Sequence, residues 1–216
     1  LPSYQWDLND TGSIAEDFRG LADGQITGAN SAWDANKSSN VLTFDGTDDF
    51  ISFGDLDEMD QIDRFTFSIW FKRTSDTSST PTNHGVHNVL LGQSSGGSND
   101  NLEIGTNGSN VQLYVDSGSA ETDATVTFDA GLVNDRWYHL AVVYGSELSL
   151  FLDGVKISTW TQYNGRLESS QASPLSIGVA RPNSNRWGDF SGSLAEARIY
   201  LSELSDEEIG ILAGGS

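Results

Sequence analysis

The chain has 216 residues, no cysteine, and 31 acidic against 11 basic residues, a formal net charge of −20 at pH 7. The missing cysteine excludes disulfides, thiolate zinc sites and cysteine nucleophiles. The negative charge argues against nucleic-acid binding and against docking on an anionic membrane. No run approaches the roughly 20 apolar residues that a membrane span needs, so we expect no membrane insertion.

Alternation of apolar and polar residues with a period of two predicts β-strands along most of the chain. In chain order, strands are expected at residues 41–44, 50–53, 65–71, 87–92, 101–105, 110–115, 124–128, 137–144, 148–152, 155–157, 174–180 and 192–200. Asp153-Gly154 predicts a hairpin between two of them, since this pair suits a type I′ turn. Turn residues at short spacing favour a sandwich or barrel over alternating βα units.

Only the end of the chain has a helical pattern. Ser205 and Glu208 fit a capping box before Ile209, which predicts a short helix that plugs or staples one end of the sandwich. The loop-like stretches 73–86 and 94–100 are too short for interdomain linkers, so residues 1–216 are expected to form one domain. The chain does not open with a signal-peptide pattern, and both ends look cut from a larger surface or secreted protein.

Five blocks of sequence follow one another in a recognisable order. They are Tyr4–Asp10 with Glu16–Gly20, Leu42–Ile51, Phe65–Lys72, Trp137–Tyr144 with Leu152–Val155, and Phe190–Tyr200 with Leu204–Ile209. Together they resemble the bacterial concanavalin A-like, laminin G-like domain family. The resemblance implies an all-β, two-sheet antiparallel jelly-roll sandwich with one short C-terminal helix. It also implies carbohydrate or protein binding, often with a calcium ion, in a bacterial extracellular protein that is secreted or on the cell surface.

The acidic turn that contains Asp45, Asp48 and Asp49 is the best candidate for a calcium site, because calcium takes six to eight oxygen ligands. If the chain ends meet, as the resemblance implies, Asp7 on the first strand and Glu196 on the closing strand are further candidate ligands. The family usually carries an acidic residue directly before this glutamate, whereas this chain has Ala195. The alternative interpretation is a solvated acidic turn without a metal.

The loop at 183–189 is the best candidate for a sugar site, because sugar binding needs an exposed aromatic ring beside polar groups. The candidate residues of this loop are Asn183, Asn185, Arg186 and Trp187. An adjoining rim is expected from His84, His87, Asn88, Asp100 and Asn101. Trp160 with Tyr163 is a second candidate. The alternative is that these aromatic rings only cover the edge of the core.

Catalytic motifs are weak in this sequence. Residues 92–96 match G-x-S-x-G, but a nucleophile elbow needs a strand that leads into a helix, and another strand follows here. Glu103, Glu121 and Glu168 are available for glycoside hydrolysis, but nothing in the sequence pairs them. We therefore expect a non-catalytic, calcium-assisted glycan-binding module that serves adhesion, in a monomer. The alternatives are a structural or protein-binding spacer and a diverged glycoside hydrolase.

Overall fold

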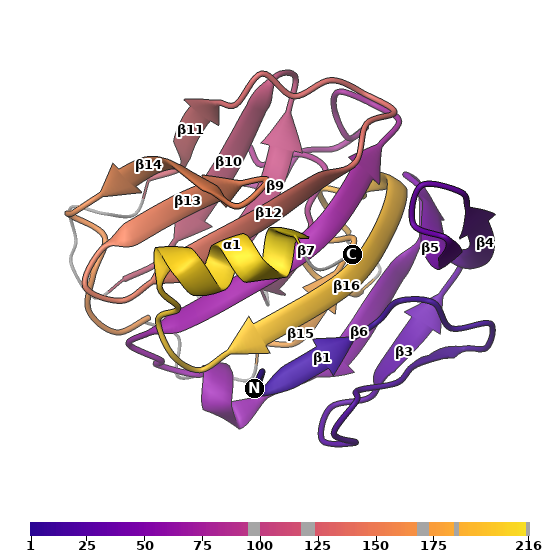
Figure 1. Cartoon of the computed structure of the whole chain (residues 1–216), viewed down its shortest axis with the longest axis horizontal. Helices are drawn as coiled ribbons and strands as arrows, with labels where there is room; N and C mark the ends of the chain where they lie inside the picture. Colours follow the sequence, from indigo (N-terminus) through magenta and orange to yellow (C-terminus); the bar gives the residue numbers. More distant parts are fainter. Residues whose placement is uncertain (95–99, 118–123, 168–172, 184–185, 215–216) are drawn as a thin grey trace.

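Two antiparallel eight-stranded sheets pack face to face and make up almost the whole fold (Figure 1). The computed structural model describes residues 1–94, 100–117, 124–167, 173–183 and 186–214, without the side chains of Asp100 and Asn101. The sandwich expected from the alternation and from the resemblance is confirmed.

Sheet A has the order β14-β13-β12-β7-β16-β5-β4, with β1 paired to β16. Its strands are β1 (Tyr4–Trp6), β4 (Asn30–Asp34), β5 (Ser39–Asp45), β7 (Phe65–Arg73), β12 (Tyr138–Tyr144), β13 (Leu148–Leu152), β14 (Val155–Trp160) and β16 (Ser191–Tyr200). Because β1 pairs with β16 in the register Tyr4 to Ile199, the first and last strands of the chain lie side by side.

Sheet B has the order β11-β10-β9-β8-β15-β6-β3-β2. Its strands are β2 (Ile14–Ala15), β3 (Gly24–Thr27), β6 (Phe50–Gly54), β8 (Leu91–Ser94), β9 (Asp100–Asn107), β10 (Asn110–Val115), β11 (Val126–Asp129) and β15 (Leu175–Ile177). A 3-10 turn, η1 (Asp57–Met59), follows β6.

The main hydrophobic core fills the space between the sheets. β7 supplies Phe65, Phe67, Ile69 and Phe71 from one face, all fully buried, as the alternation predicts. Each such side chain contributes about 1.5–3 kcal/mol by leaving water. β7 lies at the centre of sheet A, where its two edges pair with β12 and β16.

The C-terminal helix α1 (Asp206–Gly214) begins at the predicted capping box. The backbone N–H of Ser205 donates to Glu208 Oε2 (2.8 Å), and the N–H of Glu208 donates to Ser205 Oγ (3.3 Å). The expected position at one end of the sandwich is wrong. Ile209 packs with Ala141, Val143 and Phe151, so α1 lies across the outer face of sheet A (Figure 1).

Two predicted strands are shorter than the sequence pattern indicated. The strand expected at 87–92 is β8 at Leu91–Ser94, because Asn88 adopts a positive φ of 40° and breaks the extended run. The strand expected at 174–180 ends at Ile177, where Gly178 follows with a φ of 87°. In both segments the apolar residues outside the strand are buried within the loops themselves and are not paired in a sheet.

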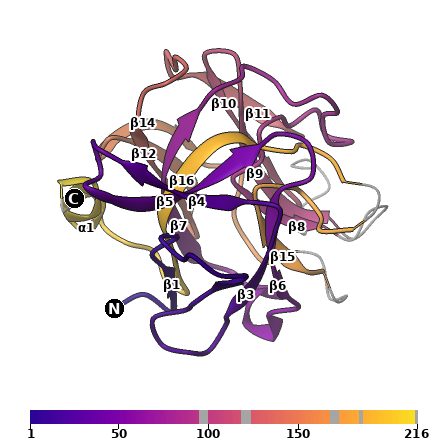
Figure 2. The same cartoon turned by 90° about the vertical axis from the view of Figure 1, so that its right-hand side faces the viewer.

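Irregular loops cover the outer face of sheet B, on the side of the molecule opposite α1 (Figure 2). The β7–β8 loop (residues 74–90) and the β15–β16 loop (residues 178–190) enclose a small apolar cluster of Val86, Val89, Tyr114 and Ala180. Two strand glycines permit this close approach. A Cβ at Gly92 would overlap Ala180, and a Cβ at Gly105 would overlap His87.

Candidate functional site

Three connections between strands join into one surface, which we call the three-loop surface: the β5–β6 turn (residues 46–49, with Asp45), the β7–β8 loop and the β15–β16 loop. Gly188 holds the two loops together, because its N–H donates to the carbonyl of Thr80 (2.8 Å) and its carbonyl accepts from Val89 (2.7 Å). Arg186 links the β15–β16 loop to the β5–β6 turn, because its Nη2 donates to the carbonyl of Thr47 (3.2 Å).

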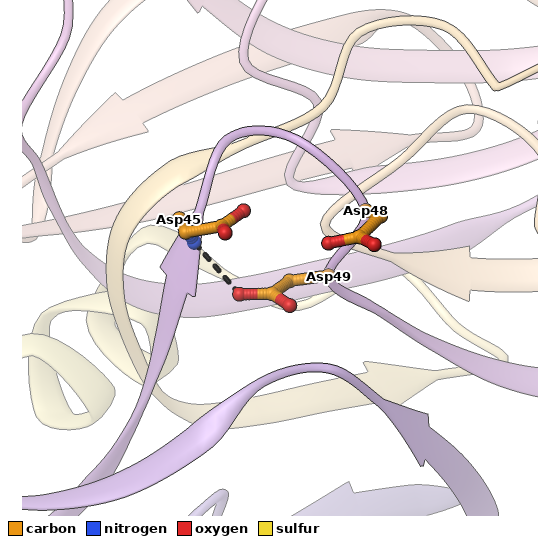
Figure 3. A group of neighbouring side chains, drawn as sticks. All are labelled: Asp45, Asp48 and Asp49. Atoms are coloured by element: carbon orange, nitrogen blue, oxygen red, sulfur yellow. Dashed lines mark hydrogen bonds between the residues drawn. The ribbon is translucent and has the colours of Figure 1, made fainter.

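Three carboxylates converge at the β5–β6 turn (Figure 3). Asp45, Asp48 and Asp49 each place an oxygen within 4.8 Å of the others. Asp49 is buried, and its Oδ2 accepts the N–H of Asp45 (2.7 Å), while Asp45 Oδ1 accepts the N–H of Thr47 (2.8 Å). The turn therefore fixes two of the three carboxylates by hydrogen bonds to its own backbone.

The electrostatics of this turn favour a cation. Burial raises the pKa of Asp49, and the charges of Asp45 and Asp48 raise it further. Burial also raises the pKa of the neighbouring Asp189, which the Arg186 guanidinium opposes from 3.4 Å. The donor set consists only of oxygen atoms, and Asp45 and Asp48 are exposed, so the residues fit a hard divalent ion such as calcium.

The structure does not bring Asp7 and Glu196 to this cluster. The N–H of Glu196 donates to the carbonyl of Asp7 (3.1 Å), so these two residues lie together. Glu196 also pairs with Arg198 (3.0 Å) and Lys37 (3.8 Å), which already neutralise it. Ser191 pairs with Asp45, and Glu196 stands five residues farther along β16, roughly 16 Å away at ~3.3 Å per residue.

An open pocket of about 310 Å³ adjoins the carboxylate cluster. Its lining is rich in hydroxyl and carboxylate groups: Asp45, Gly46, Ser75, Thr77, Ser78, Ser79, Asp189 and Ser191. Ser78 Oγ donates to the carbonyl of Asp189 (2.9 Å), which ties one wall to the other. Such a lining offers several hydrogen-bond partners for sugar hydroxyls.

The predicted aromatic loop lies beside this pocket. Trp187 is half-buried, and the Arg181 guanidinium stands 3.8 Å from the centre of its ring. Asn183 is exposed, and Arg186 is half-buried beside Asp189. Asn185 lies outside the described residues. The loop thus presents an indole ring whose orientation is set by a guanidinium.

The predicted rim divides into three groups. His84 is half-buried and stacks on Tyr114, and the backbone N–H of half-buried His87 donates to Gln112 Oε1 (3.2 Å). Asn88 is fully buried and donates to the carbonyl of Ser75 (3.1 Å), so its amide belongs to the fold and not to the surface. The side chains of Asp100 and Asn101 lie outside the described part of the chain.

The second aromatic candidate belongs to the edge of the core. Tyr163 is buried and its hydroxyl donates to the carbonyl of Ala124 (3.0 Å), while Trp160 packs edge-on against Phe128.

Of the G-x-S-x-G match, Gly92 to Ser94 lie in β8, and residues 95 and 96 are outside the described part. Glu121 and Glu168 are outside it as well.

Two features of the surface were missed by reasoning from sequence. The hydroxyl-rich pocket wall comes from residues 75–79, a Ser/Thr-rich run whose composition could have indicated it. Glu103 is fully buried beneath His84. No local signal could have found this pair, because the two residues are 19 positions apart and meet only when β9 passes under the loop.

Comparison with known proteins agrees with this architecture. The chain matches the family described as the Concanavalin A-like lectin/glucanases superfamily over residues 45–210. Among curated proteins none matches. Among the described residues, no helix is long and apolar enough to cross a membrane.

Solved structures show the same fold at low sequence identity. Domain 4 of AbnA, a GH43 extracellular arabinanase from Geobacillus stearothermophilus in complex with arabinotriose, is 17% identical with a TM-score of 0.69, and 98% of each chain is covered. A Trypanosoma rangeli sialidase in complex with sialic acid is 16% identical (TM-score 0.69) over 97% of this chain and 32% of that chain. The botulinum neurotoxin serotype D binding domain is 12% identical (TM-score 0.68) over 100% of this chain and 52% of that chain.

Proposed function

We propose that this chain, which belongs to the concanavalin A-like lectin/glucanase superfamily, is a single non-catalytic module that binds glycans on the three-loop surface with the help of calcium. The observation that carries the proposal is that Asp45 belongs both to the carboxylate cluster and to the lining of the hydroxyl-rich pocket. A calcium ion at the cluster would therefore order the wall of the pocket itself.

Calcium would be held by Asp45, Asp48 and Asp49, with carbonyl groups of the turn as further oxygen donors. When bound, it supplies positive charge that relieves the repulsion between these carboxylates. Because Arg186 connects the turn to the β15–β16 loop, ordering the turn also steadies the loop that carries Trp187. The protein side chains that contact the sugar are then the pocket hydroxyls and the indole ring.

A non-catalytic role is supported by the burial of Glu103. This glutamate is fully buried beneath His84, so its carboxylate does not face the pocket. Glycoside hydrolysis would need two carboxyl groups on either side of a sugar bond. The fold neighbour solved with arabinotriose is described as domain 4 of an extracellular arabinanase, and its complex with an oligosaccharide supports sugar binding. We propose the same setting for this chain: a secreted or cell-surface bacterial protein that uses the module for adhesion.

A glycan panel tests the carbohydrate proposal. The protein is applied to immobilised neutral and acidic oligosaccharides with calcium or with a chelator, as wild type and as Trp187→Ala. We expect binding that calcium strengthens, and a loss of about tenfold in Trp187→Ala because one stacking ring is removed. Trp33→Ala is the control, since Trp33 is an exposed tryptophan on β4, outside the three-loop surface. Silence across the panel, or an equal loss in both variants, would favour a structural or protein-binding spacer.

Thermal melting tests the calcium proposal. Adding calcium at about 100 times its Kd should raise the Tm by about 5–10 °C, since binding to the folded state alone stabilises it by ~2.7 kcal/mol. Asp49→Asn removes a buried ligand with little change of volume and should abolish the shift. Asp55→Asn, an exposed aspartate outside the cluster, should retain it. If the wild-type Tm is the same with calcium and with chelator, the site does not exist.

A further inference from the structure

The pocket of the three-loop surface is surrounded by negative charge. Four carboxylates lie in its wall or in the adjoining cluster: Asp45, Asp48, Asp49 and Asp189. Arg186 contacts one of them, so this group of five side chains carries a net charge of −3. A calcium ion at the cluster would reduce that charge to −1 without reversing its sign, and the whole chain has a formal net charge of −20. An anionic ligand would therefore enter against a negative potential, whereas a neutral ligand would not.

Arg186 is held by partners within the protein. Its Nε donates to Oδ1 of Asp189 (3.4 Å), a residue that is 5% exposed, and its Nη2 donates to the carbonyl of Thr47 (3.2 Å). The pair adjoins the hydroxyl-rich pocket, because Asp189 belongs to its lining. An anionic group that approached this guanidinium would meet the Asp189 carboxylate at the same place. The charge of Arg186 is thus already compensated within the fold.

Arg181, the other arginine of the β15–β16 loop, is engaged with an aromatic ring. Its guanidinium carbon lies 3.8 Å from the centre of the Trp187 ring, and the residue is 8% exposed. The remaining lysines and arginines of the chain lie outside the residue ranges of the three-loop surface. Both arginines of this surface are therefore committed to protein groups before a ligand arrives.

We propose that the glycan bound on the three-loop surface is neutral, and that the Asp189–Arg186 pair determines this preference. The inference rests on the proposed function and names the class of sugar that the site takes. Hydroxyl groups of a neutral sugar can donate to Asp189 and accept from the serine and threonine hydroxyls of the pocket. A sugar carboxylate can only accept, so beside Asp189 it would gain no hydrogen bond and would meet a like charge.

Matched glycans test the class of sugar. Trigalacturonate and sialyllactose are each measured beside their methyl esters on wild type at saturating calcium, with arabinotriose as a further neutral probe. We expect the neutral member of each pair to bind at least about tenfold more tightly than the acidic member. Raising NaCl from about 0.1 M to about 1 M shortens the Debye length from ~10 Å to ~3 Å. This change should reduce the ratio of the two Kd values, because charge repulsion causes the difference.

Releasing Arg186 tests the role of the pair. Asp189→Asn keeps the volume of the side chain and removes the carboxylate partner of Arg186, so the preference for the neutral member should fall about fivefold. The double variant Asp189→Asn/Arg186→Gln has no guanidinium to release and should restore the wild-type ratio. Asp63→Asn is the matched control. It breaks the exposed pair with Arg64 directly before β7, away from the three-loop surface, and should leave the ratio unchanged.

The outcomes separate the inference from the proposed function. Wild type alone decides the class of sugar, so this part does not depend on the folding of Asp189→Asn. A wild type that binds the acidic member as tightly as the neutral one, or whose strongest binder on the glycan panel is acidic, overturns the inference while the glycan proposal stands. Equal changes in Asp189→Asn and Asp63→Asn, or a change that persists in the double variant, overturn the role of the pair. If no glycan binds wild type, the proposed function fails and the inference fails with it.

Discussion

The outer faces of the two sheets are covered in different ways, although both belong to one sandwich. Sheet A is covered by a regular helix and by a compact group of charged and aromatic side chains. Sheet B is covered by irregular loops held through backbone hydrogen bonds and two strand glycines. The helical cover buries apolar surface and adds stability, whereas the loop cover presents polar groups to solvent. The difference separates a face that a helix stabilises from the face on which we propose that glycans bind.

The charged group on sheet A shows how closed that face is. Lys37 Nζ lies 3.3 Å from the ring centre of Trp70 and 3.8 Å from Glu196, and its side chain is 5% exposed. Burial lowers the pKa of Lys37 to about 8, against the pull of Glu196. His139 lies beside Trp70 and is fully buried. These groups are shielded from ligands, so we assign them to stability.

Removing the buried anchor of α1 should have the largest effect on the stability of the helix-covered face. Ile209→Ala should lower the free energy of unfolding by about 3 kcal/mol, because it leaves a cavity against Ala141, Val143 and Phe151. Ile211→Ala, on the 65% exposed side of the same helix, should change it by less than about 0.5 kcal/mol. Urea denaturation measures both. Equal effects would mean that α1 does not stabilise sheet A.

Acid should destabilise the closed face through His139, with a smaller effect. Burial lowers the pKa of His139 to about 4, and the charges of Arg198 and Lys37 lower it further. The unfolded chain takes up a proton near pH 6.5 and the folded chain does not, so stability falls as pH drops from 6.5 towards 4. The loss between pH 8 and pH 5 is about 2 kcal/mol. His139→Phe should remove this part of the pH dependence, as urea titrations at several pH values will show. An unchanged slope would mean that His139 is not buried in its neutral form.

Local signals made much of the fold predictable. The Asp153-Gly154 turn forms the expected hairpin with both residues at positive φ, and the Ser205 cap starts the helix where expected. The short strands β3 and β4 were missed because β3 alternates over only four residues and β4 has no buried apolar residue, so pairing with β6 and β5 forms them. The position of α1 was also missed, because sequence shows that a helix has an apolar side but not which surface receives it.

The candidate site was predictable where its residues are close in sequence. Asp45, Asp48 and Asp49 lie within five positions, so one turn determines their convergence. Asp7 and Glu196 do meet, but register places them away from that turn, and register depends on pairing across the whole sheet. Asn88 has the side chain of a surface residue, yet the loop folds back and buries it.

Gly92 and Gly105 have a consequence for how this module could diversify. Both let the loop backbone pack directly on the strand backbone. The contacts that hold the loops of the proposed binding face on sheet B therefore do not involve the side chains proposed to contact the sugar. We expect that exchanging Asn183 or Trp187 changes the sugar specificity without disturbing the sandwich. A substitution at either glycine would instead lift the loops from the sheet and end binding of every sugar at once. Selection for new ligands should therefore vary the loop tips and leave the two glycines fixed.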